Sequence, residues 1–165
     1  RTFQQTRIYS KMDCVDNMQI SVSQRKGSSS TMFASRSGEI RDRAEHLLEF
    51  VGLYSKRSLI SGDLSFGQQK LLEFAMALMN DPKVLLLDEP TAGINPTLIN
   101  GLIDRLRRAN EELGITLCVI EHNMRVIMNL ASNIYCLSNG KMLASGKPED
   151  LQNDPRVIDA YLGGH

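Results

Sequence analysis

The sequence has 165 residues, of which 42% are hydrophobic and 23% are charged, and this balance favours one globular domain or most of one. Nineteen basic and nineteen acidic residues give a net charge of zero, and the absence of a basic stripe argues against nucleic acid as the main partner. No apolar run approaches the roughly 18 to 20 residues needed to cross a bilayer, so we expect a chain that does not itself span a membrane. Three widely spaced cysteines indicate buried free thiols rather than a disulfide framework.

The N-terminal part of the chain predicts a loop followed by an amphipathic helix. The small residues at 27–37, GSSSTMFASRS, predict a loop because they offer no face to bury. From Glu39 to Leu53 the apolar residues recur three and four positions apart, which predicts a helix that ends near Gly52.

The segment LSFGQ, from Leu64 to Gln68, precedes a second predicted helix that runs from Gln69 to about Met79. Ser65 and Gln68 have the spacing of a capping box, which by itself is a sufficient structural reason for both residues. A functional interpretation is also possible, since Gly67 would let a ligand approach the backbone and a helix N-terminus attracts anions such as phosphate.

The segment VLLLDEPTAGIN, at 84–95, predicts a short buried strand that ends in two carboxylates before Pro90. Asp88 and Glu89 then lie at the carboxyl end of the strand, the edge where open α/β sheets bind ligands. In P-loop nucleotidases an acidic residue at this place holds magnesium, and its neighbour can orient an attacking water. A buried strand that merely reaches the surface would give the same local pattern.

A helix and a second strand follow this acidic segment. Asn95 is predicted to cap a helix that begins near Pro96 and ends near Leu113, and residues 115–120, ITLCVI, read as a continuous apolar strand. A strand, helix and strand of these lengths predict parallel pairing, which brings His122 to the same edge as the acidic pair. A single histidine is usually structural or exposed, but at this edge it is a candidate for a phosphate contact.

The last part of the chain contains a clear hairpin signal. Residues 134–138 and 141–145 flank Asn139 and Gly140, a pair that suits the positive φ angles of a type I′ turn. Pro148 and Pro155 are each predicted to open a short terminal helix.

Taken in order, these segments resemble the ATPase subunit of an ATP-binding cassette (ABC) transporter over nearly the whole chain. LSFGQ looks like the signature motif, VLLLDEP like Walker B, AGIN like the D-loop, and the histidine of VIEHNM like the switch histidine. RTFQ, at the start of the chain, looks like the Q-loop. The segments DEPTAGINP, IEHNM and VIDAYLGG resemble in particular the cassettes of branched-chain amino-acid importers.

The resemblance implies an α/β fold: a partial P-loop nucleotidase core with parallel strands, flanking helices and a C-terminal β-hairpin, plus an α-helical subdomain. Residues 1–80 would hold the Q-loop and the helical subdomain with the signature motif. Residues 81–165 would form the C-terminal part of the catalytic core, with Walker B, the D-loop and the switch histidine.

The resemblance also implies a role for each motif residue in binding ATP and Mg²⁺. Asp88 would hold the magnesium and Glu89 would activate or orient the attacking water, while His122 would contact the γ-phosphate. Gln4 would contact the metal and link the site to the membrane partner.

Ser65, Gly67 and Gln68 would close over the nucleotide held by a second ABC ATPase subunit, identical or different, and Asn95 would cross the same interface. Transmembrane permease subunits would be the other partners, with the chain peripheral on the cytoplasmic face of the plasma (inner) membrane. The implied function is ATP hydrolysis coupled to solute import, with branched-chain amino acids as the solute class.

The sequence departs from the family pattern at several positions. Phe66 stands where the signature commonly has glycine, Asn95 where the D-loop commonly has aspartate, and Met76 where the helix often has arginine. No G-x-x-x-x-G-K-[ST] motif occurs, so we expect a fragment that starts at the Q-loop and is inactive alone. Two alternatives stay open: a non-hydrolytic interaction remnant, and a soluble ABC-type ATPase that is not involved in transport.

Overall fold

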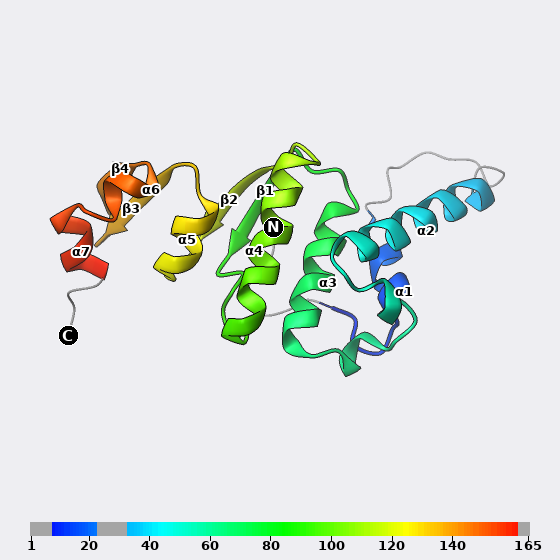
Figure 1. The fold of residues 1–165 in the computed structure, drawn as a ribbon. Helices are drawn as coiled ribbons and strands as arrows, with labels where there is room; N and C mark the ends of the chain where they lie inside the picture. The colour runs from blue at the N-terminus through cyan, green and yellow to red at the C-terminus, as the bar shows by residue number, and fades with distance from the viewer. Residues whose placement is uncertain (1–7, 23–32, 162–165) are drawn as a thin grey trace. The chain divides into compact units, whose positions relative to one another are not determined.

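The structure is a computed structural model that describes residues 8–22 and 33–161 (Figure 1). The chain divides into two compact units, unit 1 at residues 1–120 and unit 2 at residues 121–165. The resemblance places a boundary at residue 80, between the helical subdomain and the catalytic core. This boundary is defined by motifs and not by compactness, so it stays a prediction.

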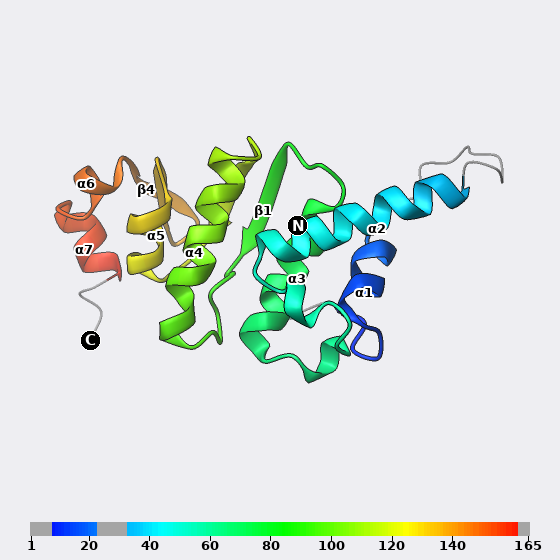
Figure 2. The ribbon, with the colours of Figure 1, turned by 45° about the vertical axis from the view of Figure 1, so that its right-hand side comes forward.

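Unit 1 begins with helices and ends with a pair of strands. Its described elements are, in chain order, α1 (Cys14–Ile20), α2 (Phe33–Phe50), the 3-10 turns η2 (Tyr54–Lys56) and η3 (Ser61–Asp63), α3 (Phe66–Leu78), β1 (Val84–Asp88), α4 (Pro96–Glu111) and β2 (Thr116–Ile120). Helices α1, α2 and α3 pack against one another as a helical group (Figures 1 and 2).

The helical group packs around the apolar stripe that the sequence predicts for α2. The side chains of Ala44 and Leu48 on this helix, and of Val51 directly after it, are fully buried. The helix begins at Phe33, however, so the prediction of a loop up to residue 37 was wrong. Ser37 and Gly38 are exposed and add nothing to the apolar stripe. The helix extends through them because propagation from a packed segment needs no further burial.

Asn17 is a fully buried polar residue that joins α1 to η3. The backbone N–H of Tyr9 donates to its Oδ1 at 2.7 Å, and its Nδ2 donates to the carbonyl of Asp13 at 2.8 Å and to Ser61 Oγ at 3.1 Å. Ser61 Oγ in turn donates to the carbonyl of Tyr9 at 2.9 Å. The residues before α1 are therefore held against the residues that precede α3.

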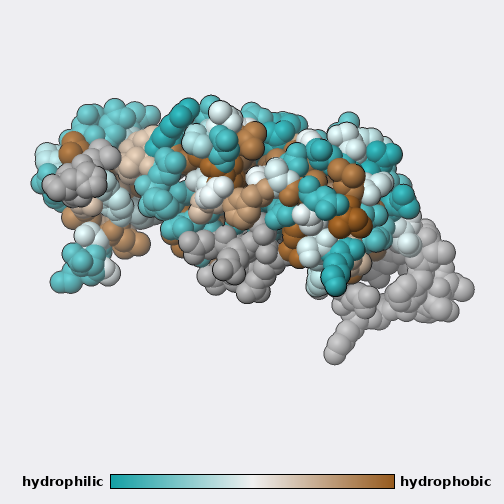
Figure 3. Space-filling view, turned by 90° about the horizontal axis from the view of Figure 1, so that it is seen from below, coloured by the Kyte–Doolittle hydropathy of each residue, from teal (hydrophilic) through white to brown (hydrophobic). Residues whose placement is uncertain are grey.

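Strands β1 and β2 pair in parallel, as predicted, with Val84 opposite Thr116 and Asp88 opposite Ile120. The apolar run of β1 predicted a buried strand. In β1, Leu85 and Leu87 are buried, whereas Leu86 is 48% exposed. The described residues therefore cover one face of the pair and leave the other open. Figure 3 shows hydrophobic areas that reach the surface on one side of the molecule.

Helix α4 connects the two strands and begins at the predicted cap. Asn95 Oδ1 accepts a hydrogen bond from the backbone N–H of Thr97 at 3.0 Å, and Pro96 occupies the first turn. Leu102, Ile103 and Leu106 are buried, as the 3.6-residue period predicts. Leu98, which the same period places on the apolar stripe, is 51% exposed.

Unit 2 consists of short helices and a hairpin. Its described elements are α5 (Met124–Leu130), β3 (Ile134–Ser138), β4 (Lys141–Gly146), α6 (Pro148–Leu151) and α7 (Pro155–Tyr161). Strands β3 and β4 pair antiparallel, with an irregularity between Cys136 and Leu137. The unit has its own apolar core, formed by Ile134, Cys136, Ala144, Leu151 and Val157. The α/β class, with parallel strands and a C-terminal hairpin, is therefore confirmed.

The hairpin turn allows a direct test of backbone strain. Asn139 and Gly140 have φ angles of 50° and 74°, as the type I′ turn predicts, and a Cβ on Gly140 would meet nothing within 4 Å. We expect Gly140→Ala to lower the free energy of unfolding by about 1 kcal/mol, because alanine is strained at positive φ. Gly38→Ala is the matched control: it also has open space, but it lies inside α2 and is expected to raise stability by about 0.5–1 kcal/mol. Urea denaturation followed by circular dichroism measures both changes, and equal signs would contradict the prediction.

All three cysteines are free thiols, as predicted. Cys14 and Cys136 are buried, and burial raises the pKa of Cys14 to about 11. Cys118 is exposed, contrary to expectation, because it lies on the open face of the strand pair. Across the described parts of the chain, every helix is too short or too polar to span a bilayer.

Candidate nucleotide site

The acidic pair lies at the carboxyl end of β1. Asp88 is opposite Ile120 in the register, and the backbone N–H of Glu89 donates to the carbonyl of Ile120 at 2.9 Å. Because side chains alternate along a strand, Asp88 belongs to the same open face as Leu86. Glu89 has a φ of 45°, an uncommon left-handed conformation for a residue other than glycine. Such strain is concentrated at functional sites, so the structure supports Glu89 as a candidate.

The loop that follows Glu89 consists of two tight turns. The N–H of Ala92 donates to the carbonyl of Glu89 at 3.0 Å, and the N–H of Ile94 donates to the carbonyl of Thr91 at 3.1 Å. Thr91 and Ile94 are buried, and Gly93 between them has a φ of 73°. The loop is therefore compact, and it ends at Asn95, the N-cap of α4.

The N-terminus of α3 has the predicted capping box. The N–H of Ser65 donates to Gln68 Oε1 at 3.0 Å, and the N–H of Gln68 donates to Ser65 Oγ at 3.4 Å. The N–H groups of Phe66 and Gly67 lie in the first turn, where a helix has no internal acceptors for them. Together with the helix dipole, these two donors can receive an anion.

The structure brings the first turn of α3 next to the loop after Glu89. A Cβ placed on Gly67 would lie 3.8 Å from Ile94 Cγ2, and one placed on Gly93 would lie 2.9 Å from Phe66 Cε1. The LSFGQ and AGIN segments, predicted separately, therefore form one continuous surface of unit 1.

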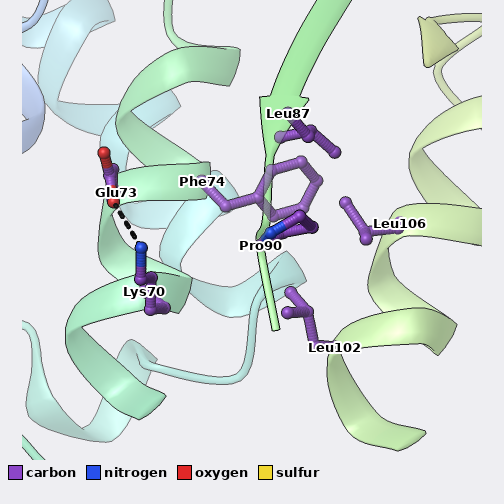
Figure 4. A pocket seen from close by; sticks show the side chains of 7 residues that line it. All are labelled: Lys70, Glu73, Phe74, Leu87, Pro90, Leu102 and Leu106. Carbon is purple, nitrogen blue, oxygen red and sulfur yellow. Dashed lines mark ion pairs between the residues drawn. The ribbon is translucent and has the colours of Figure 1, made fainter. Parts of the chain in front are cut away.

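A buried ion pair lies further along α3, and the sequence did not predict it. Lys70 Nζ and Glu73 Oε2 are 3.9 Å apart on α3, and their side chains are only 4% and 8% exposed. In Figure 4 the pair lies on one side of α3, and Phe74 extends from the helix away from the pair and toward Pro90. A cavity of about 10 Å³ is lined by Lys70, Glu73, Phe74, Leu87, Pro90, Leu102 and Leu106. The spacing of three residues indicates that Lys70 and Glu73 can pair on a helix, but it does not indicate that both side chains are buried.

The donors for a metal ion are few. Within the described ranges, no three His, Cys, Asp or Glu side chains are grouped to hold a metal. Asp88 is a carboxylate at the end of β1. One such carboxylate suits Mg²⁺ bound with a nucleotide, since that ion commonly takes one or two carboxylates and completes its shell with phosphate and water.

Two predicted site residues are not placed against the acidic pair. His122 lies in unit 2, two residues after the end of β2, and its backbone N–H donates to Glu121 Oε2 at 3.2 Å. Its approach to Asp88 and Glu89 therefore stays a prediction. Gln4 lies outside the described residues.

Comparison with protein families gives two matches. A profile described as "ABC transporter" matches residues 1–92, which is more than half of the chain. A second profile, described as "Branched-chain amino acid ATP-binding cassette transporter", matches residues 141–165. The two matches lie at opposite ends of the chain and agree with the motif order.

The chain is similar to curated transport proteins along nearly its whole length. It is 36% identical over 170 residues to the "Probable branched-chain amino acid transport ATP-binding protein LivG" of Archaeoglobus fulgidus, covering 99% of this chain and 65% of that protein. It is 34% identical to the "High-affinity branched-chain amino acid transport ATP-binding protein BraF" of Pseudomonas aeruginosa, covering 99% and 67%. The chain therefore spans about two thirds of the length of these relatives.

Solved structures of cassettes have the same fold. The ADP conformation of an ATP-binding cassette of an ABC transporter aligns with a TM-score of 0.79 at 28% identity, covering 99% of this chain and 68% of that one. A dimeric ATP-binding cassette in a post-hydrolysis state, bound to ADP and phosphate, aligns with a TM-score of 0.72 at 26% identity, covering 89% and 61%.

Proposed function

Since the chain belongs to the ABC transporter ATPase family, we propose that it serves in coupling ATP hydrolysis to the import of branched-chain amino acids through separate membrane subunits. The observation that carries this proposal is the acidic pair at the end of β1, with Glu89 in a left-handed conformation. Directly after this pair, the chain enters a loop that packs on the first turn of α3.

Asp88 is proposed to hold Mg²⁺ bound with ATP. Its place on the open face of β1 supports this role, because a ligand can reach that face without displacing the described core. The ion would supply a positive charge that stabilises the developing charge on the transferred phosphoryl group.

Glu89 is proposed to orient the attacking water, and His122 to donate a hydrogen bond to the γ-phosphate. The backbone of Glu89 is held by its bond to Ile120 and by the turn to Ala92, so its Cα is fixed on both sides. Fixed placement of a base relative to its water is a large part of catalysis in phosphoryl transfer. Gln4 is proposed to contact the metal and to link the site to the membrane subunits.

Ser65, Gly67, Gln68 and Asn95 are proposed to act on the nucleotide held by a second cassette. Two observations support a shared surface: the first turn of α3 presents N–H donors, and the loop that ends at Asn95 packs beside it. The relative that is dimeric with ADP and phosphate is consistent with such a pair. The chain would work peripherally on the cytoplasmic face of the membrane, bound to permease subunits.

The test is uptake of radiolabelled leucine by proteoliposomes that hold the assembled transporter with MgATP inside. We expect uptake with ATP, none with a non-hydrolysable analogue, and loss of uptake in Asp88→Asn. Asp104→Asn, which changes an exposed aspartate on α4, is the matched control and should retain uptake. Uptake that survives Asp88→Asn would contradict the proposal.

The surface formed by the first turn of α3 and the loop that ends at Asn95 would also serve a second candidate, an interaction module that does not hydrolyse ATP. Adding the chain to an ATPase-competent cassette distinguishes the two. Stimulated hydrolysis that Glu89→Gln leaves unchanged would support the interaction module.

A further inference from the structure

The aromatic ring of Phe66, the first residue of α3, lies directly over the backbone of Gly93. A Cβ on Gly93 would be 2.9 Å from Phe66 Cε1, closer than carbon atoms approach without displacement, and 3.5 Å from Cζ, in ordinary contact. Gly93 also has a φ of 73°, so glycine is favoured there for two independent reasons. The ring and the glycine are therefore matched in shape.

The ring of Phe66 is also partly exposed and lies near a cation. Phe66 is 43% exposed, and Lys70 Nζ lies 5.7 Å from the ring centroid, one turn further along α3. A large exposed aromatic side chain at a helix start contributes little to a core. Its contact with Gly93 instead joins two segments that lie more than 25 residues apart in the sequence.

The next residue extends this contact to α4. A Cβ on Gly67 would lie 3.3 Å from Leu98 Cδ1 and 3.8 Å from Ile94 Cγ2. Ile94 is buried, and its N–H is bound to the carbonyl of Thr91. The first turn of α3 is thus packed against both the loop and the first turn of α4.

We propose that Phe66 is a positioning residue that holds loop 90–95 against the N-terminus of α3, so that Ser65, Gln68 and Asn95 are presented as one surface. This inference rests on the proposed function, in which those three residues act together on the partner's nucleotide. With glycine at position 66 there would be no ring to hold the loop. Phe66, which stands where the signature commonly has glycine, thus supplies a contact within the chain.

A double-mutant cycle tests the contact itself in the 165-residue chain. Gly114→Ala reports the strain of positive φ alone, because Gly114 has a φ of 65° and open space around it, and it should reduce the folding equilibrium constant about tenfold. Gly93→Ala adds the clash with the ring and should cost about a further tenfold. In a Phe66→Ala background this excess should vanish. An excess that persists there, or equal costs for the two glycines, would overturn the contact.

Turnover of the assembled cassette dimer tests the positioning role. We expect Phe66→Ala to lower kcat for MgATP about tenfold with KM changed less than about twofold, because orientation is lost and not nucleotide binding. Phe66→Tyr should restore kcat, since it keeps the ring. Tyr54→Ala, which removes an aromatic side chain of similar exposure (41%) elsewhere in unit 1, should leave both constants unchanged.

The two hypotheses fail in different ways. Normal turnover in Phe66→Ala, beside an inactive Glu89→Gln, would overturn the positioning role alone. Normal turnover in Glu89→Gln would overturn the proposed function, and the positioning role that rests on it, while the double-mutant cycle still decides whether Phe66 holds the loop.

Discussion

Glu89→Gln is expected to lower the rate of MgATP hydrolysis by the assembled cassette dimer by about 100-fold or more, with nucleotide binding retained. The substitution preserves the size of the side chain but removes the carboxylate that is proposed to orient the attacking water. It should not disturb the backbone, because the hydrogen bond from the N–H of residue 89 to Ile120 does not involve the side chain. The effect should therefore be confined to kcat.

Steady-state phosphate release measures the rate, and binding of a fluorescent ATP analogue measures affinity. Glu111→Gln, an exposed glutamate near the end of α4, is the matched control and should behave as wild type. If Glu89→Gln hydrolysed ATP at the wild-type rate, Glu89 would have no part in the chemistry. If it lost nucleotide binding as well, its role would be in binding rather than turnover.

Asn17→Ala is expected to lower the free energy of unfolding by about 3 kcal/mol. The side chain is fully buried, and its removal leaves the N–H of Tyr9, the carbonyl of Asp13 and Ser61 Oγ with fewer partners. Leaving buried polar groups unsatisfied costs the desolvation that folding imposed on them.

Asn110→Ala is the matched control for this prediction. Asn110 is exposed and donates a hydrogen bond to the carbonyl of Ile115, so its loss should cost less than about 1 kcal/mol. Urea denaturation followed by circular dichroism suits both variants because the chain contains no tryptophan. Equal losses for the two asparagines would show that the Asn17 network does not stabilise the helical group.

Much of the candidate site could be predicted because its parts are local. The capping box of Ser65 and Gln68, the cap at Asn95 and the end of β1 at Asp88 each depend on residues within a few positions. Parallel pairing of the two strands followed from the length of the connection. The role of Gln4 came from resemblance alone, whereas that of His122 came from its expected place at the sheet edge together with the resemblance, and both stay predictions.

Other features could not be predicted because they depend on residues distant in the chain. The apolar run of β1 indicates a buried strand but does not say which face the rest of the chain covers, and Leu86 is on the open face. The spacing of Lys70 and Glu73 does not reveal that both are buried. Phe66 was visible only as a departure from a motif, without its contact at Gly93.

By itself, the sequence determined the helix caps, the hairpin turn and the order of the motifs, since each follows from backbone geometry or from side chains a few residues apart. Tertiary structure alone decided that Asn17 binds Ser61, 44 residues away, and that Phe66 lies on Gly93. The physical reason is that such contacts form when distant segments are packed together, and packing depends on the shape of the whole unit rather than on any local pattern.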